Sequence, residues 1–139
     1  MKMRHVFAAA LLLCAGQAVA QQPLYKQANA PIEERIKDLM ERMTVEEKVG
    51  QLCCPMGWEM YTKTGNKVEA SELYKKQMGN GMPIGSYWAV LRADPWTQKT
   101  LENGLNPELA AEALNKLQKF AAEETRFGIP VLFAEETPP

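Results

Sequence analysis

The pattern of strand, long helix and strand in the second half of the chain constrains the fold most. Residues 83–91 are apolar almost throughout, as is typical of a strand buried on both faces of a parallel sheet. Asn106 and Pro107 predict the start of a long helix, Gly128 its end, and residues 129–134 a second buried strand. A βαβ unit needs a larger sheet around it, because two parallel strands alone leave both edges unpaired. We therefore predict an α/β fold whose sheet is incomplete in this chain.

The N-terminal segment predicts export. Lys2 and Arg4 precede the apolar run 6–15, and residues 18–20 form a small-x-small cleavage site. This pattern is typical of a secretory signal peptide, here residues 1–20 with cleavage after Ala20. The apolar run is well short of the roughly 20 residues that a spanning helix needs, so no membrane attachment is expected after cleavage. A lipoprotein would use Cys14, but Leu13 is large for the position before a lipidated cysteine. We expect a secreted or periplasmic protein.

Loss of the signal peptide also limits the chemistry. It removes His5, the only histidine in the sequence. The rest of the chain can then build neither a Ser-His-Asp triad nor a histidine metal site. Cys53 and Cys54 are adjacent, so they could bridge only through a strained ring, and two thiols make a poor zinc site. Small apolar packing is the role expected for them, and no metal is predicted.

Composition argues against a nucleic-acid partner. The chain is 46% hydrophobic and 24% charged, with a formal net charge of −1 and no basic block. Binding to a phosphate backbone depends on clustered Lys and Arg, which are missing here. No feature of the sequence indicates an oligomeric state.

The first half of the chain is expected to be helical. After an extended leader over residues 21–30, Pro31 begins a helix whose apolar residues recur at spacings of three and four, which predicts one buried face. Thr44 and Glu47 have the spacing of a capping box, so Glu47 is predicted to cap a second helix and not to act in catalysis. Residues 62–67 predict a polar turn, and residues 69–78 an exposed helix.

Two segments resemble a known family. Residues 31–54 are similar to the opening of glycoside hydrolase family 3, where a helix leads into the pattern R-M-T-x-E-E-K-x-G-Q-L. Residues 126–136 resemble the family segment R-x-G-I-P-x-L-x-x-E-E. The two segments occur in the family's order, and the resemblance is to bacterial secreted β-glucosidases and β-xylosidases. It implies that residues 31–139 are the first part of a (β/α)8 TIM-barrel-like domain, helix-rich and incomplete here.

The resemblance also implies an activity. Members of the family remove terminal non-reducing β-linked sugars by the retaining route, which uses two carboxyl groups about 5 to 5.5 Å apart and no metal or organic cofactor. The expected partner is therefore a β-linked oligosaccharide or other β-glycoside. The family nucleophile and acid/base follow later strands, and neither position occurs in these residues. After Glu136 the family continues toward a His-Gly pair, whereas residues 137–139 are Thr-Pro-Pro, so we expect a truncated N-terminal fragment that is inactive by itself.

Glu135 and Glu136 are not expected to be the catalytic pair. Neighbours on a strand point to opposite faces, so they cannot act on one bond from the same side. By the family pattern, Glu136 matches the carboxylate that holds hydroxyl groups of the sugar in the −1 subsite. A solvated glutamate at a strand end is the alternative. Many β-glucosidases have a shorter aspartate there, so the longer Glu136 favours pentosides such as xylosides.

Aromatic residues offer a second set of candidates. The three tryptophans could either stack on a pyranose ring or pack in the core, and packing is the more common role: Trp58, Trp88 and Trp96. Tyr61, Arg92 and Asp94 lie in loop-like stretches that could line the edge of a substrate cleft.

Two alternatives to the glycosidase fragment stay open, namely a non-catalytic carbohydrate-binding module and a helical remnant without a ligand.

Overall fold

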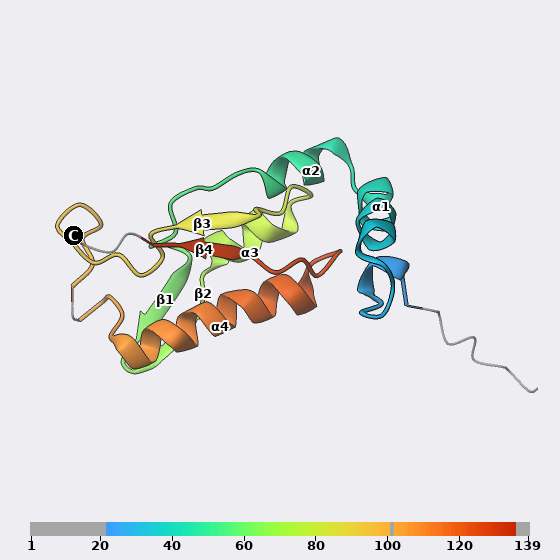
Figure 1. Ribbon diagram of the computed structural model, residues 1–139. Coiled ribbons are helices and arrows are strands. Elements are labelled where there is room, and N and C mark those ends of the chain that lie inside the picture. Colours follow the sequence, from blue (N-terminus) through green and yellow to red (C-terminus); the bar gives the residue numbers. More distant parts are fainter. Residues whose placement is uncertain (1–21, 101, 136–139) are drawn as a thin grey trace, which may run out of the picture. The chain divides into compact units, whose positions relative to one another are not determined.

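The computed structural model describes residues 22–100 and 102–135 (Figure 1). The expected signal peptide and Glu136 lie outside the described residues. Within them the chain forms four α-helices, one short 3-10 helix and four short strands, which pair in two small sheets. The α/β class predicted from the sequence is thus confirmed. The chain divides into two compact units at residues 39 and 40, and each is described by itself.

The first unit holds a 3-10 helix and most of helix α1. The 3-10 helix η1 spans Leu24–Lys26, so the leader is not extended throughout as predicted. The backbone N–H of Tyr25 donates to Asp38 at 3.0 Å, and Arg35 Nε donates to the carbonyl of Tyr25 at 3.1 Å, and these bonds fold the leader back onto α1 (Ile32–Arg42).

The prediction of a buried face on α1 is wrong for the residues that the structure describes. The apolar stripe exists, but no residue of α1 is buried, and Ile32 and Ile36 are exposed. The periodicity correctly predicts a helix. It does not guarantee that the described part of the chain contains an element to cover the stripe.

Helix α2 (Val45–Gln51) begins as predicted. The hydroxyl of Thr44 accepts from the N–H of Glu47, whose carboxylate accepts from the N–H of Thr44 at 2.8 Å. This reciprocal pair is a capping box, which satisfies two N–H groups that the first turn leaves without helical partners. The assignment of Glu47 as a cap is confirmed.

The segment after α2 differs from the prediction. Residues 61–70 form a β-hairpin of β1 (Tyr61–Thr64) and β2 (Lys67–Ala70), with Gly65 at φ +59 in its turn. The predicted polar turn is the tip of this hairpin. Helix α3 spans Glu72–Gly79 with Ser71 as its cap, and it buries Tyr74 and Met78, so the exposed helix over 69–78 begins later and is not fully exposed. Short strands of mixed polarity carry too weak a period-2 signal to predict them.

The predicted βαβ unit is present. Strand β3 (Ser86–Trp88) pairs in parallel with β4 (Leu132–Ala134), and helix α4 (Pro107–Glu124) connects them. Asn106 caps α4 by accepting from the N–H of Leu109 at 2.8 Å. The strands are shorter than the apolar runs that predicted them. Gln118 of α4 exchanges two hydrogen bonds with the backbone of Val131, which fixes the helix to the start of β4.

A further extended segment lies on the other side of β3. The N–H groups of Ser86 and Trp88 donate to the carbonyls of Cys53 and Pro55, and the N–H of Gly57 donates to Trp88 at 2.7 Å. These bonds follow the slanted pattern of a parallel pair. Residues 53–57 therefore run beside β3 as a third parallel segment. The spatial order of segment 53–57, β3 and β4 is the same as their order in the chain.

The main core lies between β3, α3 and α4. Tyr87, in the middle of β3, is fully buried and its ring packs 5.5 Å from that of Tyr74 on α3. The ring of Tyr74 contacts Phe120 of α4, and its hydroxyl donates to the carbonyl of Leu117 at 2.9 Å. Burial raises the pKa of both tyrosines well above the usual range, so these hydroxyls are neutral donors.

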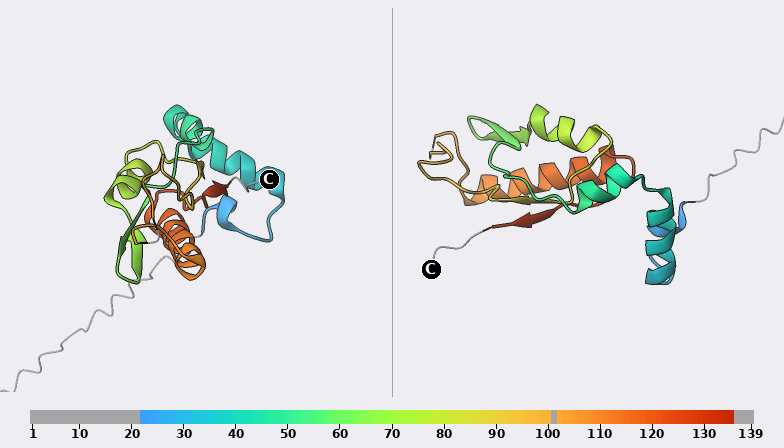
Figure 2. Two further views of the ribbon diagram at one scale, coloured as in Figure 1. Left: turned by 90° about the vertical axis from the view of Figure 1, so that its left-hand side faces the viewer. Right: turned by 90° about the horizontal axis from the view of Figure 1, so that it is seen from above.

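The two faces of the β3–β4 pair differ in their cover. Tyr87 and its partner Phe133 face the side of α3 and α4, whereas Leu132, paired with Ser86, is 73% exposed. The hairpin and the helices are seen from two further sides in Figure 2. In the described part of the chain, no helix is long and apolar enough to cross a bilayer.

Candidate functional site

The candidate site lies at the carboxyl ends of the parallel strands. Trp88 is the last residue of β3 and pairs with Ala134, the last residue of β4, which Glu135 follows. Trp58 comes directly after segment 53–57. In parallel α/β sheets, binding and catalytic residues collect at this edge because the strand-to-helix loops all start there.

Three indole rings meet at this edge. The ring centroids of Trp58 and Trp96 lie 5.0 Å apart, and those of Trp88 and Trp96 lie 6.4 Å apart. In both pairs the ring planes are tilted relative to each other, as aromatic contacts prefer. We call Trp58, Trp88 and Trp96 the tryptophan cluster. Trp96 is 56% exposed, and the other two are half-buried.

Arg92 organises the tryptophan cluster. Its guanidinium carbon lies 4.8 Å from the ring centre of Trp96 and 5.4 Å from that of Trp88. Each contact is a cation–π interaction, worth about 0.5–1 kcal/mol at an exposed site. Arg92 Nε also donates to Asp94 at 2.5 Å. One side chain thus ties two indoles to the loop that follows β3.

The loop itself is closed by hydrogen bonds between Asp94 and Thr97. The N–H of each residue donates to the other's side chain, at 3.1 and 2.9 Å, and the hydroxyl of Thr97 also donates to the carbonyl of Asp94. The N–H of Thr97, together with Arg92, lowers the pKa of the Asp94 carboxyl below its ordinary value of 3.8. Asp94 is therefore ionised near neutral pH and engaged as an acceptor.

Backbone strain marks the same edge. Ala89, the residue after β3, has φ 60, a left-handed conformation that residues with a Cβ seldom adopt. Its N–H donates to the carbonyl of Ala134 at 2.8 Å, and the N–H of Leu91 donates to Glu135 at 3.0 Å. These bonds join the ends of β3 and β4 and hold the strained turn. Such strain persists where the surroundings fix it, and it is concentrated at functional sites.

The structure brings some, but not all, of the candidate site residues named from the sequence close together. Arg92, which the sequence places only in a loop, lies against two of the tryptophans and pairs with Asp94, and Glu135 accepts from the backbone amide of Leu91. Tyr61 is buried in β1, beneath Lys99, whose Nζ lies 4.7 Å from its ring centre. Burial lowers the pKa of Lys99, and the negative charge of Glu59 opposes this effect.

Cys53 and Cys54 are free thiols. Cys53 packs against the core, but Cys54 is exposed, contrary to the packing expected for it.

Sequence reasoning missed Thr97 and Ala89. The spacing Asp94-x-x-Thr97 is a capping-type signal that could have indicated the closed loop. No feature of the sequence indicates that Ala89 has a positive φ. Segment 53–57 was also missed, because Pro55 and Gly57 are unusual in strands. Within the described residues, no group of three or more His, Cys, Asp or Glu side chains is arranged to hold a metal ion.

The two segments that carry the family resemblance contact each other away from this edge. Arg126 Nη1 donates to both carboxylate oxygens of Glu47 at 2.9 Å, and Nη2 reaches the carbonyl of Arg42 at 3.3 Å. Glu47 Oε2 still accepts from Thr44, so the capping box and the ion pair share one buried carboxylate. Both motif residues therefore have structural roles.

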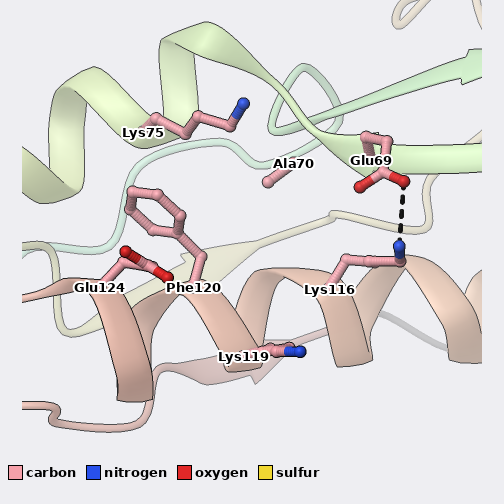
Figure 3. A pocket seen from close by; sticks show the side chains of 7 residues that line it. All are labelled: Glu69, Ala70, Lys75, Lys116, Lys119, Phe120 and Glu124. Carbon is pink, nitrogen blue, oxygen red and sulfur yellow. Dashed lines mark hydrogen bonds and ion pairs between the residues drawn. The ribbon is translucent and has the colours of Figure 1, made fainter.

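A hollow elsewhere on the described part of the chain is lined by none of the residues of the tryptophan cluster. It is an open pocket of about 250 Å³ between α4, β2 and α3 (Figure 3). Lys116 pairs with Glu69 across it at 2.9 Å, which raises the pKa of Lys116, and Lys75 at its rim pairs with Glu72 at 2.6 Å. Its cations are already paired, and it lies away from the strand ends. The tryptophan cluster is the better candidate.

Comparison with known proteins agrees with the sequence resemblance. The chain is 31% identical over 113 residues to a putative β-xylosidase of Formosa agariphila, an alignment of 81% of this chain and 13% of that protein. It is 30% identical over 121 residues to β-glucosidase C of Emericella nidulans, covering 82% of this chain and 16% of the relative. A probable β-glucosidase C of Aspergillus oryzae is 34% identical over 78% of this chain and 15% of its own length.

The chain is related to β-glucosidases and β-xylosidases. The resemblance inferred from the two sequence motifs is thereby confirmed. No family model matches the chain. The chain spans about one seventh of the length of these relatives, and their names describe whole proteins.

Proposed function

We propose that this chain is the N-terminal part of a secreted, retaining, exo-acting β-glycosidase of glycoside hydrolase family 3. The whole enzyme would hydrolyse terminal non-reducing β-D-glycosyl residues in carbohydrate breakdown. The observation that carries the proposal is the similarity to β-glucosidases and a β-xylosidase over about four fifths of the chain. The 139 residues would be inactive without the rest of the protein.

The arrangement of strands supports a barrel portion. Segment 53–57, β3 and β4 are parallel and neighbour one another in chain order, with α3 and α4 between them. Both helices contact the Tyr87 side of the sheet, while Leu132 on the other face is exposed. A doubly wound sheet has helices on both faces, whereas a (β/α)8 barrel has them only outside. The exposed face would then be the one that turns toward the barrel interior.

The proposed chemistry needs groups outside these residues. In the retaining route, one carboxylate attacks the anomeric carbon and a second carboxylic acid protonates the leaving oxygen. Asp94 is paired with Arg92, and Glu135 accepts from the Leu91 amide, so neither is placed for such a role. Glu136 follows directly, and its proposed role is to accept hydrogen bonds from hydroxyl groups of the sugar in the −1 subsite. No metal or organic cofactor takes part in this scheme.

A β-xylosidase is the second candidate within the same scheme. The named β-xylosidase among the relatives favours it, as does the glutamate at position 136. A side chain one methylene longer than aspartate would occupy the space of a hexose hydroxymethyl group. The ratio of kcat/KM on 4-nitrophenyl β-D-xyloside and β-D-glucoside distinguishes the two candidates, and a wide preference for the glucoside would exclude the xylosidase.

The test uses the polypeptide encoded by the complete reading frame of the gene. Purified from the secreted or periplasmic fraction, it should release 4-nitrophenol from a β-D-glucoside or β-D-xyloside. Glu136→Gln should lower kcat/KM by about tenfold or more, because a charged acceptor for sugar hydroxyls is lost. Glu124→Gln, an exposed position on α4, is the matched control and should leave kcat/KM unchanged.

Three results would contradict the proposal. The first is absence of hydrolysis on both substrates by a folded full-length polypeptide. The second is equal activity of Glu136→Gln and the control variant. The third is retention of residues 1–20 on the exported protein, which N-terminal sequencing would detect and which would refute cleavage after Ala20.

A further inference from the structure

We propose that Asn80 is a site of spontaneous deamidation in the folded protein, and that the fold protects Asn103 from the same reaction. The sequence contains two Asn-Gly pairs, Asn80-Gly81 and Asn103-Gly104. Glycine hinders attack on a preceding asparagine least, because no Cβ shields its nitrogen and its backbone turns freely. The two pairs are chemically alike, so a difference in rate between them must come from the structure. The inference does not depend on the proposed function.

The reaction needs only the chain and water. The backbone nitrogen of Gly81 loses its proton and attacks Cγ of Asn80, and the new C–N bond closes a five-membered succinimide ring. The bond from Cγ to Nδ2 breaks, and Nδ2 takes up a proton and leaves as ammonia. Water then opens one of the two imide carbonyls. The product is aspartate or isoaspartate, in which the main chain continues through the side-chain carboxyl group.

The position of Asn80 gives its backbone freedom to reach this geometry. Asn80 is the C-cap of α3, and both it and Gly81 are exposed. A Cβ added at Gly79 or at Gly81 would meet no atom within 4 Å, so open space lies on both sides. Inside a helix, the backbone hydrogen bonds would fix the dihedral angles of an asparagine. Asn80 follows the last turn of α3 and escapes that restraint.

The attacking nitrogen is also unengaged. Within residues 22–100 and 102–135, no group accepts a hydrogen bond from the N–H of Gly81. Asn80 Oδ1 accepts from the N–H of Met82 at 3.2 Å, a bond that asparagine commonly forms in turns. The ring that this bond closes encloses Gly81. The side-chain amide is therefore held beside the nitrogen that attacks it.

The second Asn-Gly pair is restrained at both reacting groups. The N–H of Gly104 donates to the carbonyl of Thr100 at 2.7 Å, so this nitrogen is engaged. Asn103 Oδ1 accepts from the N–H of Thr100 at 2.7 Å, and Asn103 Nδ2 donates to the carbonyl of Gln98 at 3.2 Å. Gly104 is buried, and a Cβ there would lie 2.6 Å from the Thr100 oxygen. Succinimide formation at Asn103 would have to break these bonds in a tightly packed turn.

The structure therefore predicts a ratio of two rates in one molecule. We expect Asn80 to deamidate at least about tenfold faster than Asn103 in the folded chain, a ratio that corresponds to a difference in activation free energy of only about 1.4 kcal/mol. In urea the hydrogen bonds of Asn103 are lost, and the two rates should become similar.

The test is incubation of the 139-residue chain in mildly alkaline buffer, with and without urea, followed by tryptic digestion and mass spectrometry. The two sites fall in different tryptic peptides, residues 77–92 and 100–116. Fragment ions locate the converted asparagine, and an isoaspartyl methyltransferase identifies isoaspartate. Far-UV circular dichroism shows that the chain is folded in buffer. Equal rates at the two sites in the folded chain, or a faster rate at Asn103, would overturn the proposal.

A variant and a second sample complete the test. Asn80→Gln should abolish conversion in peptide 77–92 and leave the rate at Asn103 unchanged, because glutamine would have to close a larger and less favourable ring. Conversion of that peptide at an unchanged rate would refute the assignment to Asn80. The polypeptide encoded by the complete reading frame releases the same two peptides, so its digest repeats the comparison in the whole protein. Equal rates there would also overturn the proposal.

Discussion

The ion pair of Glu47 and Arg126 gives the sharpest stability prediction, because it joins the two segments that carry the family resemblance. Arg126 Nη1 lies 2.9 Å from both oxygens of Glu47, whose side chain is only 5% exposed, while that of Arg126 is 60% exposed. Replacing Arg126 with methionine keeps much of the aliphatic stem. It leaves the Glu47 carboxylate with the N–H of Thr44 as its remaining partner among the bonds described above.

The free energy of unfolding that Arg126→Met removes should lie between two limits. Removing one partner of a fully buried ion pair costs about 3–5 kcal/mol, whereas an exposed pair contributes about 0–1 kcal/mol. Here one partner is buried and the other is mostly in water, and the capping bond survives. We therefore expect Arg126→Met to lower the free energy of unfolding by about 2 kcal/mol. Urea denaturation of the chain, followed by far-UV circular dichroism, measures it.

A double-mutant cycle isolates the pair from other effects of the substitutions. Arg126→Met, Glu47→Gln and the double variant should give a coupling free energy of about 1–2 kcal/mol. Lys119→Met is the matched control, because Lys119 forms an exposed pair with Glu123 at 3.8 Å and should cost less than about 0.5 kcal/mol. A coupling near zero, or equal losses for Arg126→Met and Lys119→Met, would refute the reasoning.

Three further predictions concern the core, a close backbone contact and the loop after β3. Tyr74→Phe removes the buried bond to the Leu117 carbonyl and should lower the free energy of unfolding by about 1 kcal/mol, measured by urea denaturation; no change would show that the bond contributes nothing net. Gly85→Ala would bring a Cβ to 2.2 Å from the carbonyl oxygen of Gln51 and should prevent the native pairing of β3, whereas Gly79→Ala, with open space around it, should fold; equal NMR spectra for both variants would contradict this. The depressed pKa of Asp94 means that its bond to Arg92 stabilises the loop above the ordinary value of 3.8 and is lost as pH falls through the lower folded value; tryptophan fluorescence should change in that range, and Asp94→Asn should abolish the transition.

The elements with strong sequence signals were predicted well. The two helix starts that were predicted from caps, at Thr44 and Asn106, match the structure, because a cap is a local interaction of a few neighbouring residues. The parallel pairing of β3 with β4 follows from the long helix between two apolar runs. The hairpin and segment 53–57 were missed, since their pairing depends on contacts that the local pattern does not encode.

The candidate site was predicted only as a set of separate residues. The sequence pattern placed Arg92 and Asp94 in a loop, but the stacking of Arg92 on two indoles depends on the positions of Trp88 and Trp96 in space. The exposed stripe of α1 shows the opposite error, because periodicity predicts a buried face only where another element covers it.

The central proposal, a retaining β-glycosidase, is tested most directly by the stereochemistry of hydrolysis. ¹H NMR during hydrolysis of 4-nitrophenyl β-D-glucoside or β-D-xyloside by the full-length polypeptide identifies the anomer that is formed first. The account predicts that the β-anomer of the released sugar appears before mutarotation produces the α-anomer. First appearance of the α-anomer, or no hydrolysis by the folded polypeptide, would contradict it.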